Sequence, residues 1–208
     1  MSLYYKERPL FLCASLNSIF TQTVIPDEVI LVEDGPLTDE LYSVLDEYEK
    51  RYTQLKRIKL LQNGGLGKAL NVGLKYCSNE LVARMDTDDI ALPDRFEKQV
   101  KFMSEHPDVD ISSGWLIEFN EFIDNRLSLK KVPETHNLIR EYIQYRNPLN
   151  HPAVIFKKSA VEKAGGYQHF PLFEDWFLWA RMLKTGAVFA NIQEPLVYFR
   201  TSPEMYKR

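Results

Sequence analysis

The stretch Glu28-Val-Ile-Leu-Val-Glu-Asp-Gly35 decides the fold, because so short an apolar run is typical of a strand buried on both faces. Residues 38–55 follow, with apolar side chains at steps of three and four residues, which predicts an amphipathic helix. Thr38 is the expected N-cap, and the acidic Asp39 and Glu40 suit the first turn of that helix.

The same alternation continues downstream of this unit. Residues 57–61 and 81–85 are expected strands, residues 66–77 form an expected helix, and Pro93 is expected at the first position of another. Strands that alternate with helices predict an α/β fold with a mostly parallel central sheet and helices on both faces. Ligands bind beyond the carboxyl ends of such strands. We therefore expect the two acidic strand ends, Glu33-Asp34 and residues 86–89, to meet at one edge of the sheet.

The second half of the chain is less regular. Strands are expected at residues 116–122, 126–132, 153–156 and 196–199, and helices at residues 136–145, 159–164 and 174–183. Gly165-Gly166 is expected to end the short helix at 159–164. Neither a repeat nor a low-complexity linker interrupts the chain, so residues 1–208 are predicted to form a single domain.

Composition narrows the class of protein. The 208 residues are 45% hydrophobic and 26% charged, as in ordinary globular domains, and the net charge is −3. A nucleic-acid-binding domain is usually basic, so no nucleic-acid partner is expected. No apolar run reaches the ~18 residues of a membrane span, which leaves at most peripheral membrane contact. With only two cysteines and nothing like a signal peptide, a cytoplasmic protein is expected.

Asp86-Thr-Asp-Asp89 carries the strongest chemical signal. Three carboxylates within four residues repel one another, and a divalent cation removes that cost. Ligand sets made only of oxygen favour hard ions such as Mg²⁺, Mn²⁺ or Ca²⁺ over zinc. The alternative is a solvated acidic turn that caps the helix near Pro93. The position of the cluster at the end of a buried strand, near a second acidic strand end, favours the metal site.

Other polar groups have weaker patterns. A carboxylate of Glu33 or Asp34 can accept from a base N–H or a ribose hydroxyl, although Asp-Gly-Pro is also ordinary turn sequence. The segment at 63–68 is a glycine-rich turn that opens a helix, where Lys68 is a candidate phosphate contact. It matches neither common phosphate-loop pattern. His151 is either a structural histidine or a metal ligand.

Glu174 and Asp175 lie at the predicted start of an aromatic-rich helix. The helix dipole favours an ionised carboxylate there, which suits a general base, because a base must be deprotonated to act. An ordinary acidic helix N-terminus is the alternative interpretation.

Taken together, these stretches resemble the family 2 glycosyltransferases of GT-A fold. The similarity covers nearly the whole chain, and its specificity comes from the spaced set of motifs. The matching pieces are residues 15–23, 29–35, 63–67 with Asn71, 84–89 with Pro93, 165–167 and 174–175. The segments 84–89 and 147–152 look like the subgroup that builds bacterial exopolysaccharide, capsule or lipopolysaccharide.

The resemblance implies roles for individual residues. Asp34 matches the carboxylate that binds the nucleoside base, and Asp86 and Asp88 match the D-x-D pair that holds ribose, metal and diphosphate. Asp89 neighbours that pair and shares the metal. Asp175 matches the catalytic base of inverting members, with Glu174 beside it. The family also implies a UDP-, GDP- or dTDP-sugar donor, a saccharide or lipid-linked acceptor, and Mn²⁺ or Mg²⁺.

Three departures from the family pattern carry expectations of their own. The first strand is expected to be shortened, because residues 1–7 match only its end. The chain stops soon after residues 200–203, where related proteins continue, and Leu70 stands where an Arg is frequent. An inert nucleotide-binding relative is therefore an alternative to an active enzyme. A sugar-1-phosphate nucleotidyltransferase is a weaker one, because residues 4–9 lack the glycines of its phosphate loop.

Overall fold

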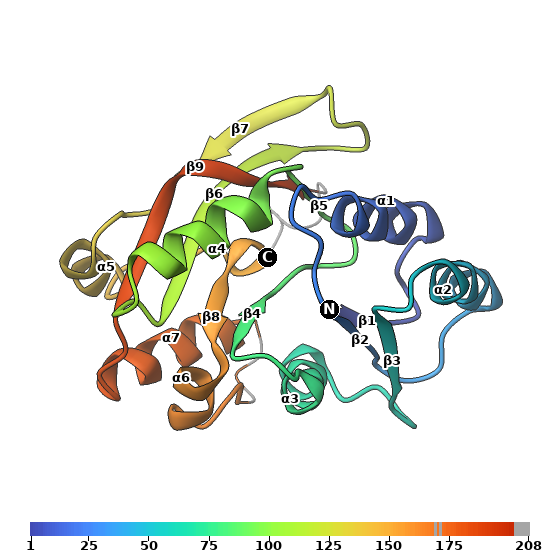
Figure 1. Ribbon diagram of the computed structural model, residues 1–208, viewed down its shortest axis with the longest axis horizontal. Coiled ribbons are helices and arrows are strands. Elements are labelled where there is room, and N and C mark those ends of the chain that lie inside the picture. Colours follow the sequence, from blue (N-terminus) through green and yellow to red (C-terminus); the bar gives the residue numbers. More distant parts are fainter. Residues whose placement is uncertain (169, 171, 202–208) are drawn as a thin grey trace.

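A computed structural model describes residues 1–168, 170 and 172–201 (Figure 1). The elements are β1 (Ser2–Leu3), α1 (Pro9–Phe20), β2 (Val29–Glu33), α2 (Asp39–Arg51), β3 (Leu55–Lys59), α3 (Leu66–Tyr76), β4 (Leu81–Ala83), β5 (Ile90–Ala91), α4 (Arg95–Glu105), β6 (Ile111–Phe119), β7 (Arg126–Lys130), α5 (His136–Tyr142), a 3₁₀ turn (His151–Ala153), β8 (Ile155–Lys157), α6 (Lys158–Lys163), α7 (Glu174–Lys184) and β9 (Phe189–Arg200).

The first half forms a three-stranded parallel sheet in the order β1-β2-β3. All five residues of β2 are buried, as the apolar run predicts. Alternate side chains point to opposite faces of a strand, so Leu31 joins the core with α1 and α2 while Ile30 and Val32 pack with Ala69 of α3. Helices therefore cover both faces of this sheet, as expected.

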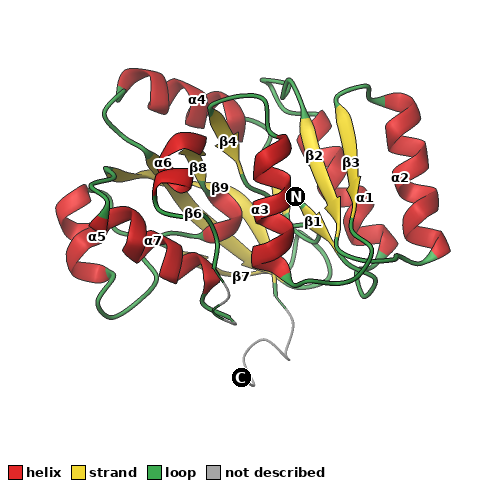
Figure 2. Cartoon of the chain, turned by 90° about the horizontal axis from the view of Figure 1, so that it is seen from below, coloured by secondary structure: helices red, strands yellow, loops and turns green. Residues whose placement is uncertain are grey.

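A six-stranded mixed sheet forms the rest of the core, in the order β4-β8-β6-β9-β5 with β7 paired to β6. The expected place of residues 81–85 in the parallel sheet is wrong. β4 pairs antiparallel with β8, and β6 with β9 is the parallel pair. The position of β4 depends on its pairing with β8, a strand much later in the chain. The local alternation of strands and helices does not predict that pairing. The α/β class is confirmed, although its parallel and mixed strands form two sheets. Figure 2 shows α3 in front of their boundary.

Local signals place several helix ends well. Thr38 caps α2, where its side chain accepts a hydrogen bond from the Leu41 N–H at 3.4 Å. The helix expected to start at Pro93 instead starts at Arg95, with Asp94 as its N-cap residue. β6 begins at Ile111 and β9 at Phe189, several residues before the expected strands, because these two strands pair with each other there. The alternation analysis assigned no helix to residues 9–20, which form α1.

Within the residues that the structure describes, no helix is both long and apolar enough to cross a bilayer. The two residues of β1 pair with Val32 and Glu33 of β2. The acidic residues that the sequence singles out at strand ends lie at the end of β2 and in the loop after β4.

Candidate active site

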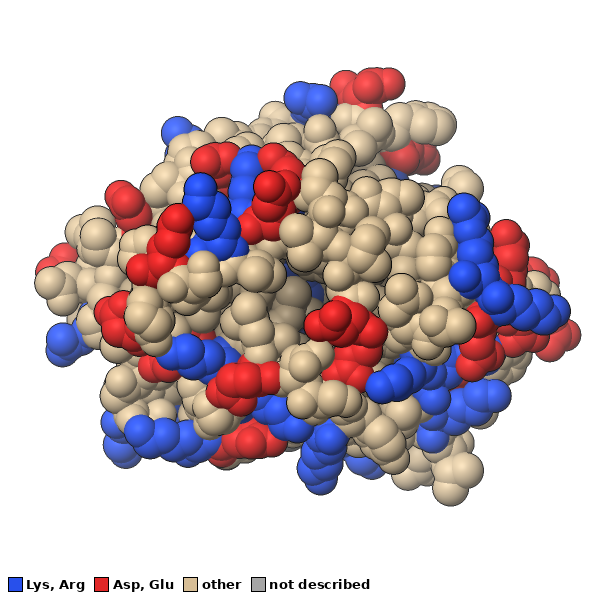
Figure 3. Space-filling view, viewed as in Figure 1, with Lys and Arg blue, Asp and Glu red and all other residues tan. Residues whose placement is uncertain are grey.

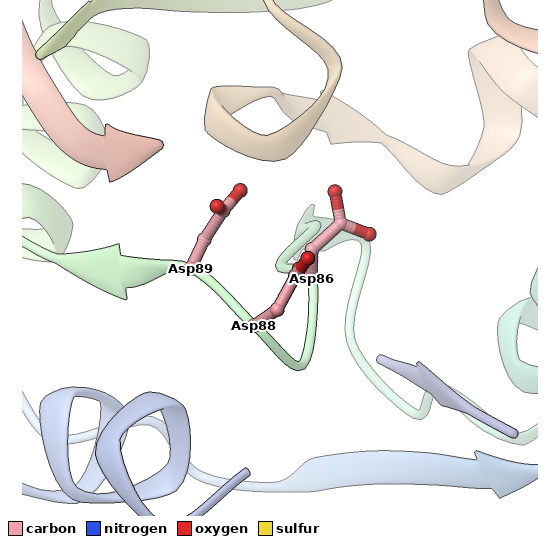
Figure 4. Close-up of side chains that lie close together, drawn as sticks. All are labelled: Asp86, Asp88 and Asp89. Atoms are coloured by element: carbon pink, nitrogen blue, oxygen red, sulfur yellow. The ribbon is translucent and has the colours of Figure 1, made fainter. Parts of the chain in front are cut away.

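The three aspartates that follow β4 lie close together. One carboxylate oxygen from each of Asp86, Asp88 and Asp89 falls within 4.8 Å of the others, and the side chains gather around one point (Figure 4). A hydrogen bond from α1 holds the loop that carries them, because the Ser15 hydroxyl donates to the Asp86 carbonyl at 2.7 Å. The expected acidic cluster is thus a compact, anchored group and not a solvated turn.

Burial raises the pKa of two of these aspartates, Asp88 and Asp89. Asp89 is 0% exposed, and burial, with the charge of Asp88, raises the pKa of Asp89 well above its ordinary value. Burial, reinforced by Asp86 and Glu7, raises the pKa of Asp88 to about 7. One oxygen of Asp89 accepts from the Arg200 N–H at 2.8 Å, whereas its Oδ2 is buried without a hydrogen-bond partner among the described residues. Asp88 and Asp89 therefore form no salt bridge among the described residues.

A divalent cation fits this set of donors. Hard cations take carboxylate oxygens, and the buried Asp89 Oδ2 is the kind of unpaired acceptor that costs free energy until it gains a partner. Asp86 and Asp88 provide the other oxygens of the site. The residues that could hold the predicted Mn²⁺ or Mg²⁺ are therefore Asp86, Asp88 and Asp89.

Asp86 already has one cationic partner. Arg84 makes a bidentate ion pair with it, and the Arg84 guanidinium is nearly buried. Arg95 is fully buried and donates a hydrogen bond to the Arg84 carbonyl at 2.7 Å. This arrangement orients the Asp86 carboxylate and leaves Asp88 and Asp89 without an equivalent counter-ion.

Glu7 is a fourth carboxylate at this site, and the sequence analysis assigned it no role. Its Oε2 accepts from the Thr87 hydroxyl at 3.1 Å and its Oε1 from the Arg8 N–H at 2.8 Å. Burial raises its pKa, and the charge of Asp86 adds to that effect. The residue lies in the loop after the short first strand, so only the pairing of β1 with β2 brings it to the cluster.

Arg200 closes the opposite side of the cluster. Its Nε donates to the Asp88 carbonyl at 2.9 Å, and its guanidinium lies 3.8 Å from the Phe11 ring centroid and 4.5 Å from that of Phe119. A cation stacked on two aromatic rings is held in place without neutralising a carboxylate directly. The long strand β9 thereby ties the loop of residues 86–89 to the mixed sheet.

Asp175 lies in the first turn of α7 and has a specific partner. Asn147 Nδ2 donates to Asp175 Oδ2 at 2.6 Å, and the Asn147 oxygen accepts from the Leu149 N–H at 3.3 Å. The second bond fixes which end of the amide faces the carboxylate. The sequence does not predict this contact, because 28 residues separate the two side chains.

Tyr167 is a buried residue in the segment before α7. Burial raises the pKa of the Tyr167 hydroxyl, the charge of Arg84 opposes this shift, and the charges of Asp175 and Asp86 add to it. The hydroxyl is 3.0 Å from His151 Nε2. Burial, with the charge of Arg84, lowers the pKa of His151 well below its ordinary value. His151 is therefore a neutral hydrogen-bond partner of Tyr167, and this contact supports its structural interpretation.

A reciprocal pair of hydrogen bonds fixes the backbone at Tyr167. Asn71 Nδ2 donates to the Tyr167 carbonyl at 2.5 Å, and Asn71 Oδ1 accepts from the Tyr167 N–H at 2.8 Å. Gly166 has a φ of 63°, and a Cβ there would lie 2.6 Å from Asn71 Oδ1. The two motifs at Asn71 and at residues 165–167 thus form one clamp between α3 and the segment before α7.

The carboxyl end of β2 reaches the same region through the glycine-rich turn. Asp34 Oδ1 and Oδ2 accept from the N–H groups of Gly64 at 2.7 Å and Gly65 at 3.0 Å. The exposed Lys68 folds its methylenes over Gly64. The Glu174 side chain packs beside Gly67, so α3 and α7 meet here. The structure therefore brings Asp34, Lys68 and Glu174 to one side of the site.

Glu33 has a different environment. It is 1% exposed, and its Oε1 lies 2.6 Å from Arg57 Nε. Arg57 also pairs with Asp46, which links β3 to α2. The observed partner of Glu33 is thus a structural cation on the neighbouring strand.

Comparison with known proteins places this geometry in a family. The family model described as "Glycosyl transferase family 2" matches residues 3–163. The chain belongs to glycosyl transferase family 2. One relative, an Escherichia coli protein named UDP-Gal:alpha-D-GlcNAc-diphosphoundecaprenol beta-1,3-galactosyltransferase, is 46% identical over all of this chain and 75% of its own length. The amylovoran biosynthesis glycosyltransferase AmsE of Erwinia amylovora is 42% identical over all of this chain and 77% of its own length.

Solved structures agree with the fold of this family 2 chain. TarS 1-349 of S. aureus in complex with UDP-GlcNAc matches with a TM-score of 0.72 and 21% identity, over 97% of this chain and 58% of that one. The mannosyltransferase PcManGT of Pyrobaculum calidifontis, in complex with GDP-Man and Mn²⁺, has a TM-score of 0.72 and 17% identity, over 99% and 58%. The GT-A fold expected from the motifs is confirmed.

The family membership settles the class of activity. This family 2 chain is a glycosyltransferase that uses a nucleotide-sugar donor, and one of its relatives is named for amylovoran biosynthesis. The weaker alternative, a sugar-1-phosphate nucleotidyltransferase, has no support from these matches.

Proposed function

We propose that this chain is an inverting, divalent-metal-dependent glycosyltransferase of surface polysaccharide synthesis. The observation that carries the proposal is a compact cluster of three aspartates, one of them fully buried and two without a salt-bridge partner among the described residues, together with a second, separately held carboxylate. Asp86, Asp88 and Asp89 form the first group, and Asp175 with its partner Asn147 forms the second. The aspartate cluster can bind the leaving group of the donor, and the separate carboxylate can activate the acceptor hydroxyl.

The acidic cluster is assigned to the donor. Asp86 and Asp88 hold the ribose and the cation of the nucleotide sugar, and Asp89 completes the oxygen ligands. When bound there, Mn²⁺ or Mg²⁺ supplies positive charge to the diphosphate that leaves. Asp34 and Lys68 lie at the glycine turn, to which we assign the approach of the nucleoside and phosphate. Glu33 receives no donor contact in this proposal, because Arg57 already holds its carboxylate.

Asp175 is assigned as the general base. The neighbouring Glu174 is assigned to binding of the nucleotide-sugar donor. One Asp175 oxygen accepts from Asn147, which leaves the other free to take the proton from an acceptor hydroxyl. The acceptor oxygen then forms the new bond to the anomeric carbon, and the bond to the nucleoside diphosphate breaks on the opposite face. A single displacement of this kind inverts the configuration, whereas two successive displacements would retain it.

The named relatives suggest which substrates to test first. Because the E. coli relative is named for UDP-Gal and a GlcNAc-diphosphoundecaprenol acceptor, we propose a UDP-sugar donor and a saccharide linked to a lipid diphosphate. A reaction on a lipid-linked acceptor would take place at the cytoplasmic face of the membrane. GDP- and dTDP-sugars are the alternatives for the donor.

Thermal stabilisation tests the donor site. UDP, GDP and dTDP are each added with and without Mn²⁺, to the natural sequence and to Asp88→Ala. A ligand at 100 times its Kd adds roughly 2.7 kcal/mol to the free energy of unfolding. We expect one nucleotide to stabilise the protein only with Mn²⁺, and Asp88→Ala to abolish the effect. Equal stabilisation without metal would contradict the assigned metal role.

A transfer assay then tests the base. Asp175→Asn should keep the Mn²⁺-dependent nucleotide binding and lose sugar transfer, and NMR of the product should give the inverted anomer. Full turnover by Asp175→Asn would show that another group is the base. Donor binding without transfer by the natural sequence, on any acceptor offered, would favour the inert relative.

A further inference from the structure

The buried guanidinium of Arg95 is a charge that the proposed function does not use. Several Lys and Arg side chains on the face drawn in Figure 3 lie beside Asp and Glu side chains, whereas Arg95 is 0% exposed. Arg95 is also the first residue of α4, where the helix dipole disfavours a positive charge. Burial lowers its pKa to about 9, so the side chain is still a cation at neutral pH. Such a cation costs stability unless its donors are satisfied.

Uncharged acceptors surround this guanidinium. Its Nη2 donates to the Arg84 carbonyl at 2.7 Å and to the Val154 carbonyl at 3.4 Å. Its Nη1 lies 3.0 Å from Met85 Sδ, and its Nε donates to Gln99 Oε1 at 2.9 Å. The hydrogen bonds that Arg95 makes among the described residues therefore all go to uncharged atoms, and their directions fix the plane of the guanidinium.

Gln99, one turn further along α4, extends these contacts. It is fully buried, and its Nε2 donates to the Ala153 carbonyl at 2.8 Å. Ala153 ends the 3₁₀ turn and Val154 follows it, whereas Arg84 follows β4. Arg95 and Gln99 thus connect the chain after β4 with the chain before β8. We call these two residues the α4 brace.

The α4 brace lies where the backbone pairing of β4 with β8 ends. The Arg84 N–H still donates to the Val154 carbonyl at 2.9 Å. In a regular antiparallel pair the Val154 N–H would donate back to the Arg84 carbonyl. It donates instead to the His151 carbonyl at 3.3 Å, within the 3₁₀ turn. Arg95 therefore satisfies a carbonyl that the strand pairing leaves free.

The two connected segments carry different parts of the proposed site. Arg84 orients the Asp86 carboxylate through its bidentate ion pair. Asn147 lies in the loop that leads into the 3₁₀ turn and donates to Asp175 at 2.6 Å. The place of the donor-binding aspartates relative to the base therefore depends on how these two segments are held together.

We propose that Arg95 and Gln99 are positioning residues for sugar transfer: the α4 brace holds residues 84–86 in place relative to residues 147–153, and so sets the bound donor against the base. The inference rests on the proposed function, which assigns the donor site and the base. A displacement of about 1 Å between reacting groups can lower a rate by about a hundredfold. Each part of the site keeps its own contacts without the brace, so its loss should lower kcat and leave nucleotide binding nearly unchanged.

A pair of variants separates positioning from stability. Arg95→Met leaves the buried Gln99 Oε1 without its donor, so Tm should fall. The double variant Arg95→Met/Gln99→Leu removes both polar groups and should recover part of that Tm, because apolar replacement of a buried polar pair is often neutral. We expect kcat per folded molecule to stay at least about tenfold below the natural value in both variants. The Kd for UDP with Mn²⁺, measured by calorimetry, should stay within about threefold, and the exposed Lys101→Met on the same helix is the control.

A merely structural brace gives different results. Recovery of kcat together with Tm in the double variant, or a loss of UDP binding as large as the loss of kcat, would overturn the positioning role. Failure of both variants to fold would assign the brace to stability alone and overturn it as well. Arg95→Lys keeps the charge without the planar set of donors and should stay impaired. Full activity in Arg95→Lys would contradict the proposal.

Asp175→Asn, measured in the same assay, distinguishes this inference from the proposed function. If Asp175→Asn is inactive and the brace variants keep their kcat, only the brace is wrong. If Asp175→Asn transfers sugar normally, the assigned base is wrong, and a loss of kcat without a loss of UDP binding in the brace variants still supports the positioning role of Arg95 and Gln99.

Discussion

The contact between Asn147 and Asp175 gives the sharpest test of the proposed base. Asn147→Ala removes the 2.6 Å donor to Asp175 Oδ2 and leaves the carboxylate free to rotate. A hydrogen bond to a charged group contributes ~1.5–3 kcal/mol, and the lower part of that range applies because both side chains are half-buried. If that orientation is needed in the transition state, a loss of about 1.5–2 kcal/mol lowers kcat roughly ten- to thirtyfold.

The rest of the Asn147 site predicts where the effect should appear. Residues 148 and 150 are anchored to Asn191 and Ser113, so the backbone under Asn147 should survive the substitution. We therefore expect kcat to fall while the Mn²⁺-dependent stabilisation by nucleotide stays unchanged. Asn147→Asp places a second carboxylate against Asp175 and should be at least as damaging, whereas the exposed Asn137→Ala is the control. A kcat within twofold of the natural value in Asn147→Ala, with Asp175→Asn inactive, would refute the positioning role.

Three further predictions concern the surroundings of the site. Glu7→Gln removes a negative charge that helps to raise the pKa of Asp88 to about 7, so the pH of half-maximal Mn²⁺ binding should fall by roughly half a unit. An unchanged titration by calorimetry would contradict this coupling. His151→Gln should lessen acid destabilisation below about pH 6.5: the unfolded state takes up the proton first, because the folded pKa of His151 is lowered, so folding loses stability as pH falls. Parallel Tm–pH curves for both proteins would show that His151 does not contribute. Gly166→Ala should lower Tm by at least about 3 °C more than Gly186→Ala, since both glycines have positive φ but only Gly166 would place a Cβ against Asn71. Equal losses in Tm would mean that Asn71 can move away from the new Cβ without a loss of stability.

Local sequence patterns predicted the elements whose partners are near in the chain. The buried run at β2, the Thr38 cap of α2 and the acidic end of β4 each follow from neighbouring residues. Their chemistry is local, since burial of a short run, capping and charge repulsion act within a few residues. The prediction that residues 86–89 form a compact acidic cluster is confirmed for the same reason.

Contacts between distant residues could not be predicted in this way. β4 pairs with β8, more than seventy residues later, and no pattern within β4 distinguishes that partner from β2. Asn147 and Glu7 are ordinary polar residues in loops, and only the folded chain brings them to Asp175 and Thr87. The salt bridge from Arg57 to Glu33 was likewise not predicted, because it joins side chains of neighbouring strands that lie 24 positions apart in the chain.

The hydrogen bonds from Gly64 and Gly65 to Asp34 have a consequence for how a phosphate could approach. A turn with exposed N–H groups before a helix is usually an anion-binding site. Here the anion is part of the chain itself, because the Asp34 carboxylate accepts both bonds. These hydrogen bonds therefore connect the end of β2 to the turn before α3. A donor diphosphate could bind the same N–H groups only by displacing the Asp34 carboxylate. In the proposed function, positive charge for the donor diphosphate would then come from Lys68 and from a cation held by Asp86, Asp88 and Asp89.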